Sequence, residues 1–343
     1  MAEERGSHYD ELIWVQPEWL HDATSWVREQ LAARGLKIVG EFDQPHLRWW
    51  STLLTVPTDG GRVWFKASAP PFRFEAGLAL KLAAWRPDCT VQLLAADPER
   101  GWMLMPDAGP RLREVLEPRG DLSHWERILP LYAGLQIDLA PHRDELLSLG
   151  VRDLRIARIP ELYERLLDDG DMLLLGLPNG LTSDELRRLE ELAPEVRALA
   201  SELAGHGFPE TLQHDDLHDG QVFVDGDRYR IFDWGDSCVS HPFHTLVVTL
   251  RSIVWTHDVP PGAPELLRLR DAYLEPWTRF APRTELVAAC ELAHRLGTIG
   301  RTLAWQSFAS AMPPAFAAET VETVPFGLKL FLEQGPIGTW SLR

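Results

Sequence analysis

Residues 212–237 carry acidic and amide side chains at a spacing that could serve one reaction. Asp216 stands two residues after His214 and five residues before Gln221. An apolar run, an Asp-Gly-Asp triplet and a second run of alternating polarity follow, which is the pattern of a β-hairpin. The second run ends at Asp233, so the hairpin places one acid before its first strand and another after its second. Such a hairpin holds two carboxylates near one reacting centre more rigidly than a free loop does.

The pattern His-x-Asp-x-x-x-x-Gln, followed by Asp233-Trp234-Gly235, resembles the aminoglycoside phosphotransferase and choline kinase-like family of the protein-kinase-like superfold. The resemblance implies that Asp216 accepts or orients the proton of an attacking hydroxyl, and that His214 braces the loop. It also implies that Asp233 and Gln221 hold Mg²⁺ on the phosphates of ATP or GTP. Gln221 stands where the family usually has Asn. Because Mg²⁺ demands near-ideal octahedral geometry, the longer side chain puts the second metal contact in question.

Two other interpretations of this stretch remain open. A loop rich in Asp and His can be a solvated connection between two strands, without chemistry. His214 and His218 could also be metal ligands of a hydrolase, although no apolar helical stripe carries them. The joint presence of two acids and a hairpin favours the phosphotransferase interpretation.

Lys66 lies near the end of a predicted strand, Arg62–Ala67, within an apolar run. A lysine in a sheet-buried strand needs an anionic partner. Nine residues later, Glu75 begins a strongly helical segment, Phe74–Trp85. By the resemblance, Lys66 and Glu75 form the ion pair that positions the nucleotide, and Lys66 reaches its α- and β-phosphates. Taken singly, Lys66 could be a surface lysine and Glu75 a charge that complements the helix dipole.

The other residues expected to contact the nucleotide are indicated less clearly by the sequence. Protein kinases cover the phosphates with a glycine-rich loop between the first two strands, but residues 40–51 contain one glycine. Ser51, or a backbone N–H near it, is expected to touch a phosphate there. Residues 106–110 contain two prolines and a glycine, which predicts a hinge. The adenine edge is then expected to bind the backbone around Met105 and Asp107.

The segment Ser240–Leu246 resembles the family's G-D-P-x-x-D-L motif, with His241 and His244 in place of both acids. The second acid of the motif usually braces the catalytic loop. His244 could do so while neutral, or while charged beside Asp216 or Asp233. Both histidines are more often structural than catalytic.

The composition is that of a globular protein with an acidic balance. The chain has 343 residues, a net charge of −17 and 45% hydrophobic residues. The negative charge argues against nucleic acids and anionic membranes as partners. No apolar run approaches the roughly 18–20 residues of a membrane span, and the acidic N-terminus is neither a signal nor a transit peptide. The three cysteines form no C-x-x-C pair and indicate reduced thiols, so we expect a cytoplasmic protein.

The acidity is uneven along the chain. Residues 121–210 contain 18 Asp or Glu against 9 Arg and no Lys. In the expected fold this region flanks the acceptor site, so the acceptor could be cationic. Helices with solvated acidic faces would produce the same excess, and charge alone does not identify a substrate. The sequence gives no indication of the oligomeric state.

The remaining segments fit a two-lobed α+β fold of the protein-kinase-like type. We expect a nucleotide-binding lobe over 1–105 with a leading helix in 1–35, a hinge at 106–110, and a helical lobe with the acceptor site over 111–343. The small lobe should hold one main helix and an antiparallel five-stranded sheet, with strands at Leu36–Phe42, Trp49–Val56, Arg62–Ala67, Thr90–Ala96 and Trp102–Met105. Helices of the large lobe are expected at Ser123–Leu139, Ile156–Leu167, Ser183–Ala204, Phe243–Trp255, Ala263–Phe280, Thr284–Ser310 and Val321–Glu333, with Ser123 and Ser183 at N-termini.

These features together predict transfer of the γ-phosphoryl group of ATP or GTP to a hydroxyl of a small molecule. An aminoglycoside or other antibiotic, an amino alcohol and a sugar are all candidate acceptors. The alternative is an inactive protein of the same fold that binds a nucleotide or a small molecule. Gln221 and the missing glycine loop favour that alternative. The joint presence of Lys66, Asp216 and Asp233 argues against it, since a binding protein does not need Asp216.

Overall fold

The computed structural model describes residues 7–116, 122–260, 262–319 and 322–337. Its contacts divide the chain into two compact units. Unit 1 comprises residues 1–110, 223–235 and 311–319, and unit 2 comprises residues 111–222, 236–310 and 320–343. Each unit therefore combines segments that are distant in the sequence.

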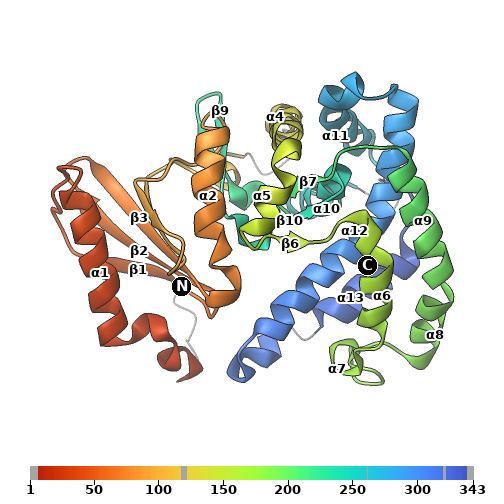
Figure 1. The fold of residues 1–343 in the computed structure, drawn as a ribbon, viewed down its shortest axis with the longest axis horizontal. Coiled ribbons are helices and arrows are strands. Elements are labelled where there is room, and N and C mark those ends of the chain that lie inside the picture. Colours follow the sequence, from red (N-terminus) through yellow and green to blue (C-terminus); the bar gives the residue numbers. More distant parts are fainter. Residues whose placement is uncertain (1–6, 117–121, 261, 320–321, 338–343) are drawn as a thin grey trace. The chain divides into compact units, whose positions relative to one another are not determined.

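Unit 1 is built on an antiparallel five-stranded sheet in the order β1-β2-β3-β5-β4 (Figure 1). Its strands are β1 (Asp43–Leu47), β2 (Ser51–Thr58), β3 (Gly61–Ser68), β4 (Ala95–Asp97) and β5 (Trp102–Pro106). In the turn between β2 and β3, Thr58 pairs with Gly61. Gly61 has φ +110°, a backbone conformation that glycine adopts without a steric cost. The prediction of an α+β fold with a five-stranded antiparallel sheet is confirmed.

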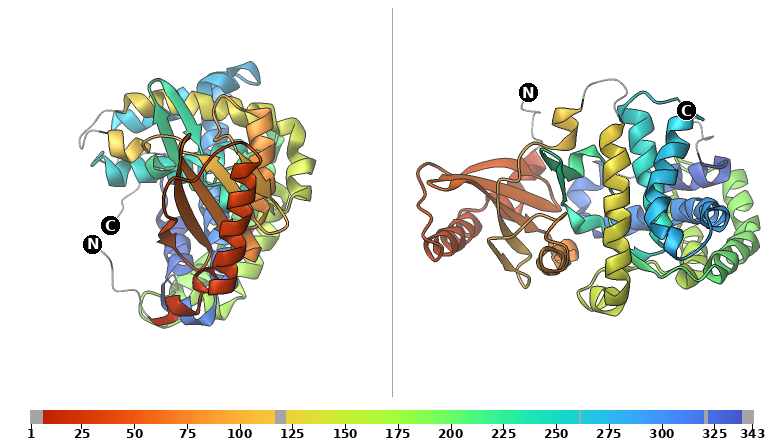
Figure 2. Two further views of the ribbon diagram at one scale, coloured as in Figure 1. Left: turned by 90° about the vertical axis from the view of Figure 1, so that its left-hand side faces the viewer. Right: turned by 90° about the horizontal axis from the view of Figure 1, so that it is seen from above.

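Two helices cover opposite sides of this sheet, α1 (Pro17–Ala32) and α2 (Phe74–Trp85) (Figure 1). In the left view of Figure 2, α1 lies in front of the strands. Successive side chains of a strand point to opposite faces of the sheet. Accordingly Phe65 of β3 packs on Trp26 of α1, with ring centroids 5.8 Å apart, and Lys66 faces Glu75 of α2. This alternation places the lysine on the side of the sheet that carries the acidic partner.

A hairpin from later in the chain completes unit 1. It consists of β8 (Val222–Asp225) and β9 (Arg228–Ile231), and its turn contains Gly226 at φ +60°. The N–H of Val224 donates to the Pro110 carbonyl at 2.9 Å, and the N–H of Ile231 donates to the Cys89 carbonyl at 2.8 Å. These bonds fix the end of β9, from which Asp233 follows directly.

Unit 2 is mostly helical (Figures 1 and 2). Its helices are α3 (Leu112–Val115), α4 (Ser123–Leu139), α5 (Arg143–Ser148), α6 (Ile159–Leu167), α7 (Gly170–Leu173), α8 (Ser183–Glu191), α9 (Ala193–Gly205), α10 (Thr245–Thr256), α11 (Pro264–Leu274), α12 (Arg283–Ala311) and α13 (Thr323–Glu333). A small sheet of β6 (Arg152–Asp153), β10 (Cys238–Ser240) and β7 (Thr211–Gln213), in that order, lies among them. Strand β7 ends one residue before His214 and therefore sets the start of the predicted catalytic loop.

Helix α4 fixes strand β7 through buried hydrogen bonds. The Thr211 hydroxyl donates to the Gln136 carbonyl at 2.7 Å, and the Gln136 side chain donates to the Leu212 carbonyl at 3.0 Å. The hydroxyl of Tyr132, one turn earlier on α4, accepts the N–H of His214 at 2.8 Å. Each polar group of this buried contact is satisfied, so the strand and the first loop residue have one defined position.

The boundaries of two predicted strands are wrong. The run Leu36–Phe42 forms no strand; only Ile38 bridges to Thr58, and the edge strand β1 begins at Asp43. Proline lacks an N–H but is tolerated on an edge strand, so β1 includes Pro45. The run Thr90–Ala96 is divided, because Thr90 bridges to Ile231 of the hairpin and only Ala95–Asp97 pairs with β5.

The predicted helices agree more closely with the structure, with three corrections. The segment Ser183–Ala204 is two helices that meet at Leu192, since Pro194 starts a new helix in α9. Thr182, not Ser183, caps α8, and its side chain exchanges hydrogen bonds with Glu185 in a capping box. Ser123 is not a cap either, because Leu122 occupies that position. The predicted start of the last helix at Val321 lies outside the described residues.

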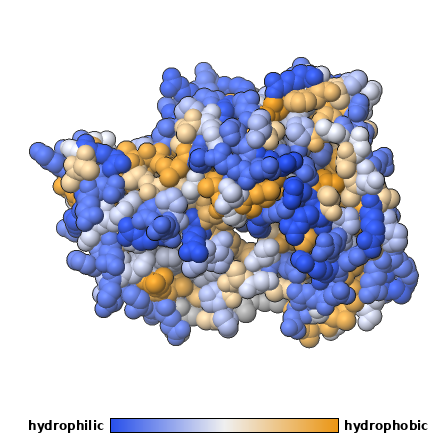
Figure 3. All heavy atoms as spheres, viewed as in Figure 1, coloured by the Kyte–Doolittle hydropathy of each residue, from blue (hydrophilic) through white to orange (hydrophobic). Residues whose placement is uncertain are grey.

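On the face shown in Figure 3, hydrophilic residues surround separate hydrophobic patches. No helix of the described ranges has the length and apolar character needed to traverse a lipid bilayer.

Candidate functional site

In unit 1, Lys66 lies between two carboxylates. Its ammonium nitrogen is 2.6 Å from Glu75 Oε1 and 2.6 Å from Asp233 Oδ1. The ion pair expected between Lys66 and Glu75 is therefore present, and Asp233 joins it. An ammonium group has three donors, so one N–H of Lys66 remains for a further acceptor. One lysine and two carboxylates leave a net charge of −1 in this cluster, which favours an additional cation.

Glu75 is the buried centre of these contacts, with 2% of its surface exposed. It also accepts the Ser68 hydroxyl at 3.0 Å and the backbone N–H of Trp234 at 3.1 Å. Burial raises the pKa of the Glu75 carboxyl, and the Lys66 ammonium counteracts this effect. Burial lowers the pKa of Lys66, but the attraction of Asp233 and Glu75 outweighs it and the pKa is raised. The lysine is therefore a permanent cation at neutral pH.

Asp233 owes its position to an unusual backbone conformation. Its φ is +65°, in the left-handed region, which Asp tolerates better than most residues. The turn brings the carboxylate to Lys66, while the next N–H reaches Glu75. A non-glycine residue in this region costs about 1 kcal/mol or more, and such residues occur preferentially at functional sites.

The other expected nucleotide-binding residues of unit 1 are less uniform. Met105 lines a cavity of about 30 Å³ together with Lys66, Met103 and Asp233. Asp107 lines a different cavity, of about 520 Å³. The N–H of Asp107 donates to the Arg62 carbonyl at 3.1 Å and so continues the sheet. An adenine contact at Asp107 would have to use its carbonyl oxygen.

Ser51 begins β2 and has 5% of its surface exposed. Its hydroxyl lies 3.3 Å from Nε2 of His46 across the turn between β1 and β2. That turn closes when the N–H of Arg48 donates to the Ser51 carbonyl at 2.9 Å. The connection between the first two strands is thus a short tight turn rather than a glycine-rich loop.

In unit 2, three side chains direct N–H groups at the Asp216 carboxylate. Arg301 Nη2 is 3.2 Å from Oδ1, Gln221 Nε2 is 3.3 Å from Oδ2, and His218 Nε2 is 3.4 Å from Oδ2. Burial raises the pKa of Asp216, but His218 and Arg301 outweigh it and bring the pKa to about 2. The carboxylate is therefore ionised and oriented at neutral pH.

His218 is oriented by its second ring nitrogen. Nδ1 faces two donors, the N–H of Gly220 at 2.9 Å and Arg113 Nη2 at 3.0 Å. A nitrogen that faces two N–H groups accepts, so the proton lies on Nε2 and is directed at Asp216. The flanking carboxylates of Asp216 and Asp219 raise the pKa of His218 against the effect of burial. A pKa raised to about 9 would give a charged ring at neutral pH, but a proton on Nδ1 would face the N–H groups of Gly220 and Arg113, so we assign the neutral Nε2–H form. Arg113 also pairs with Asp219 at 3.0 Å, which closes the loop.

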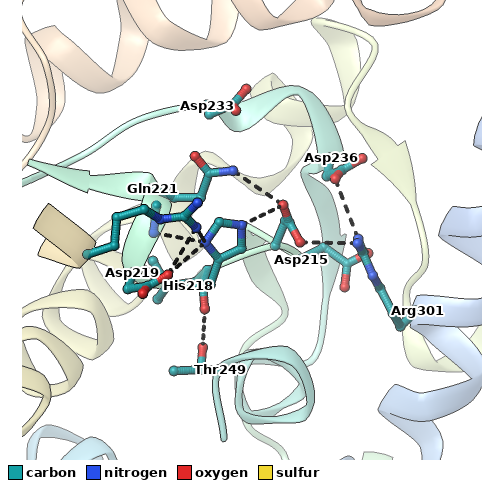
Figure 4. A network of polar contacts seen from close by, with 12 residues as sticks. Asp215, His218, Asp219, Gln221, Asp233, Asp236, Thr249 and Arg301 are labelled. Atoms are coloured by element: carbon teal, nitrogen blue, oxygen red, sulfur yellow. Dashed lines mark hydrogen bonds and ion pairs between the residues drawn. The ribbon is translucent and has the colours of Figure 1, made fainter. Parts of the chain in front are cut away.

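Arg301 was not anticipated from the sequence. It extends from α12 and lies 3.6 Å from Asp236 Oδ2 and 3.8 Å from Asp215 Oδ2, in addition to its contact with Asp216 (Figure 4). Its guanidinium also lies over the ring of Trp305, 5.2 Å from the centroid. The segment Gly297–Ala304 is otherwise uncharged and buried, and a cation in such a segment requires partners. A single arginine in a buried and otherwise uncharged helical segment is thus the sequence feature that could have indicated Arg301.

Asp215 is the second residue of the loop with a left-handed backbone, at φ +62°. It has 7% of its surface exposed, and its nearest cations are Arg301 at 3.8 Å and Arg152 at 3.9 Å. Burial raises the pKa of Asp215 to about 6, because these arginines are too distant to compensate fully. Asp215 and Asp216 are adjacent in the sequence and differ widely in proton affinity.

The three remaining histidines of the motifs are buried. His214 is fully buried, directly after β7, and its backbone is held by Tyr132 as described. Burial lowers the pKa of His244 to about 3, and Nδ1 lies 2.9 Å from the Ser240 hydroxyl. His241 accepts the N–H of Phe243 at 3.2 Å, and burial lowers its pKa as well. Of the two states considered for His244, the structure favours the neutral one.

The donor atoms fit a hard cation that is bound mainly by a nucleotide. Among the described residues, no group of three or more His, Cys, Asp or Glu side chains could hold a metal ion, which gives no support to a hydrolase centre at His214 and His218. Mg²⁺ usually takes one or two protein oxygens together with phosphates and water. The Asp233 side chain is 40% exposed and can supply a carboxylate oxygen. Gln221 uses its amide nitrogen towards Asp216, which leaves the amide oxygen for a cation.

Comparison with known proteins gives a family and a fold. The sequence matches the phosphotransferase enzyme family (APH) over residues 69–283. No match was found among curated proteins. Ethanolamine kinase of Plasmodium vivax shares 13% identity with a TM-score of 0.60, over 95% of this chain and 94% of that one.

Two further solved structures resemble the chain in the same way. Macrolide 2′-phosphotransferase MphH of Brachybacterium faecium shares 15% identity with a TM-score of 0.58, over 88% of this chain and 98% of that one. The ternary complex of streptomycin, ATP and APH(2″)-IIa shares 12% identity with a TM-score of 0.52, over 91% and 96%. At these identities the likeness shows the fold, which is the predicted protein-kinase-like fold.

Proposed function

The chain belongs to the phosphotransferase enzyme family and is a small-molecule phosphotransferase of the aminoglycoside phosphotransferase and choline kinase type; we propose that it transfers the γ-phosphoryl group of ATP or GTP to a hydroxyl of a small molecule. In this reaction the acceptor oxygen forms a bond to the γ-phosphorus, and the bond to the β–γ bridging oxygen breaks. The hydroxyl proton leaves late in the reaction.

The observation that carries the proposal is the state of Asp216. A carboxylate with a pKa of about 2 is a weak base, so its main effect is to orient the hydroxyl and to receive its proton as the new bond forms. His218, Gln221 and Arg301 hold it in that orientation. His214 contributes by fixing the start of the loop.

In unit 1 we assign the nucleotide to Lys66, with Glu75 positioning the lysine. The third donor of Lys66 would bind a phosphate oxygen. Asp233 and Gln221 would hold Mg²⁺, which neutralises charge on the phosphates during transfer. Ser51 and the backbone at Met105 and Asp107 are further proposed contacts of the nucleotide. The streptomycin and ATP bound to APH(2″)-IIa support a nucleotide and an antibiotic-like acceptor as starting points.

The test is a nucleotide-consumption screen with ATP and GTP over aminoglycosides, macrolides, amino alcohols, sugars and hydroxy acids. On any accepted substrate, Asp216→Asn should lower turnover by about 10²–10⁴, with nucleotide affinity little changed. Asp184→Asn, an exposed carboxylate of α8, is the control and should retain parental turnover. Parental turnover of Asp216→Asn would remove Asp216 from the reaction. A parent that binds Mg²⁺-nucleotide but phosphorylates nothing would favour the binding-protein alternative.

A further inference from the structure

Arg251 of α10 is a cation of unit 2, and none of the carboxylates that the structure describes pairs with it. Within the described part of the chain, its hydrogen bond runs from Nη2 to the Thr298 hydroxyl of α12, at 3.3 Å. Its Nε is buried and has no hydrogen-bond partner there. No Asp or Glu among the described residues lies within ion-pair distance of its guanidinium. Arg251 as a whole is half-buried, and a guanidinium that is partly withdrawn from water without a carboxylate partner is costly.

A second cation lies close to Arg251. Thr298, its partner, precedes Arg301 by about one turn on the same helix. Burial and the positive charge of Arg301 lower the pKa of Arg251 to about 10. That value is still about three units above neutral pH, so the guanidinium stays charged. The charge of Arg301 is matched by Asp215, Asp216 and Asp236, whereas that of Arg251 is not.

The position of Arg251 connects it with the acceptor side of the reaction. Two residues earlier on α10, the Thr249 hydroxyl donates to the Leu217 carbonyl of the catalytic loop at 2.9 Å (Figure 4). On α12, Arg301 contacts Asp216, the residue proposed to orient the acceptor hydroxyl. Arg251 thus lies on α10 and donates to α12, and these are the two helices that contact the catalytic loop within unit 2. A molecule with its hydroxyl at Asp216 is the natural source of an anion for Arg251.

We infer that Arg251 binds an anionic group of the acceptor, so that the acceptor is a hydroxyl compound carrying a carboxylate or a phosphate ester. The inference rests on the proposed phosphotransferase function. The planar fork of Arg suits both anions, because each can accept two parallel N–H bonds. The inference disagrees with the cationic acceptor considered from the sequence. That expectation came from the overall acidity of residues 121–210 and not from the side chains beside Asp216.

A purely structural role for Arg251 makes a different prediction. If its contact with Thr298 served to join α10 and α12, Arg251→Met would destabilise the protein. If Arg251 is a binding residue, the same substitution removes a half-buried charge without a carboxylate partner among the described residues and leaves the ligand-free protein as stable as the parent or more stable. Thermal unfolding without ligand therefore separates the two roles.

The experiment uses four probes of similar size and different charge: glycerate, glycerol 3-phosphate, uncharged glycerol and cationic choline. Thermal shift and phosphoryl transfer are measured at fixed ionic strength for the parent, Arg251→Met and Arg268→Met. Arg268 is an exposed arginine of α11 paired with Glu126 and Glu265, and serves as the matched control. The parent and the control should respond to one or both acids and not to glycerol or choline. Arg251→Met should bind the acid about tenfold more weakly or worse, since charge-assisted bonds to an arginine are lost. The two acids distinguish a carboxylate from a phosphate ester.

Several results would overturn the inference. These are an equal response of Arg251→Met and the parent to the acids, no response of the parent to either acid, and transfer to choline or glycerol with unchanged KM in the variant. An equal loss of Mg²⁺-ATP binding in Arg251→Met would assign the residue to the nucleotide instead. Failure of the proposed function would give a different result. The acids would raise the melting temperature of the parent and not that of Arg251→Met, but no nucleotide would be consumed.

Discussion

As proposed metal ligands, Asp233 and Gln221 would supply oxygens of different strength. The carboxylate of Asp233 carries a formal charge and lies beside Lys66 at 2.6 Å. The amide of Gln221 offers a dipole, and its nitrogen is engaged by Asp216 at 3.3 Å. A hard divalent cation gains more from the charge than from the dipole. The two residues should therefore contribute unequally to metal-dependent nucleotide binding.

We predict that Asp233→Asn loses Mg²⁺-dependent nucleotide binding more severely than Gln221→Ala. Titration of Mg²⁺ at fixed nucleotide, followed by calorimetry, measures the difference. Gln221→Asn, which installs the residue usual in the family, is the control and should bind Mg²⁺ at least as well as the parent. Equal losses, or a larger loss at Gln221, would reverse the assigned roles.

The raised pKa of Asp215 makes stability depend on pH. An unfolded Asp titrates near pH 4, whereas burial raises the pKa of folded Asp215 to about 6. Between these values the folded state keeps a proton that the unfolded state has lost. Stability therefore falls as pH rises from about 4 to 6, by up to about 3 kcal/mol, and the loss persists at higher pH.

Asp215→Asn should remove this loss, because an amide does not titrate. The melting temperature of the variant, relative to the parent, should be higher at pH 7.5 than at pH 5. The charged neighbours Arg152, Arg301 and Asp236 are unchanged in the comparison. Asp184→Asn on the surface should show the same difference at both pH values. A parent-to-variant difference that does not change with pH would show that Asp215 is ionised throughout.

At the scale of single residues, the acids and the lysine could be identified from the sequence, but the arginine that pairs with Asp216 could not. Lys66, Glu75 and Asp233 were expected at a nucleotide, and the structure places them in contact. Arg301 lies 85 positions from Asp216 in the chain, on a long helix with no motif of its own. No local pattern specifies which turn of α12 faces the loop. Only the position of Arg301 in an apolar helical segment indicated that it needs an acidic partner.

At the scale of elements, α10 and the turn before it pack closely on α12. A Cβ added to Gly297 would lie 2.8 Å from Val247 Cγ2 and 3.2 Å from ring carbons of His244. The neutral imidazole of His244 therefore packs against a helix face that has no side chain at that position. His244 is therefore held by this packing and by the Ser240 hydroxyl at 2.9 Å.

We predict that Gly297→Ala destabilises the protein by about 1–3 kcal/mol, because overpacking outweighs the gain of about 1 kcal/mol in helix propensity. Gly134→Ala in α4 is the matched control: no heavy atom lies within 4 Å of its added Cβ. The control should be stabilised by about 0.5–1 kcal/mol. Urea unfolding of both variants gives the two free energies. Stabilisation of Gly297→Ala would mean that α10 can move away without cost.

The elements themselves were predictable to different degrees. The bounds of α2 and α4 were predicted from the sequence, because α2 is rich in Ala and Leu and α4 keeps a helical spacing of apolar residues in spite of Pro130. The strand at Leu36–Phe42 failed because its apolar residues do not pair along a neighbour. Val39 is 64% exposed, and the sheet edge is taken by the following segment. Strand pairing depends on distant partners, which a local pattern does not contain.

At the scale of the whole molecule, binding of a ligand should increase the free energy of unfolding. A nucleotide that binds only the folded chain stabilises it by about 2.7 kcal/mol at one hundred times its Kd. We predict that Mg²⁺-ATP or Mg²⁺-GTP raises the melting temperature and that a chelator abolishes the effect. Lys66→Ala should lose most of this shift when compared with its own ligand-free baseline. An undiminished shift in Lys66→Ala would place the nucleotide elsewhere.

The return of residues 223–235 to unit 1 has a consequence for biosynthesis. Lys66 and Asp233 are 167 positions apart, so at about 5–20 residues per second the ribosome makes the second roughly 8–33 s after the first. Throughout that interval the nascent sheet carries Lys66 and Glu75 without their third partner, and the Pro110 carbonyl lacks its β8 donor. The first unit cannot mature before about two-thirds of the chain has emerged. Pulse-labelled nascent chains released before and after the hairpin should therefore differ sharply in protease resistance of their N-terminal hundred residues.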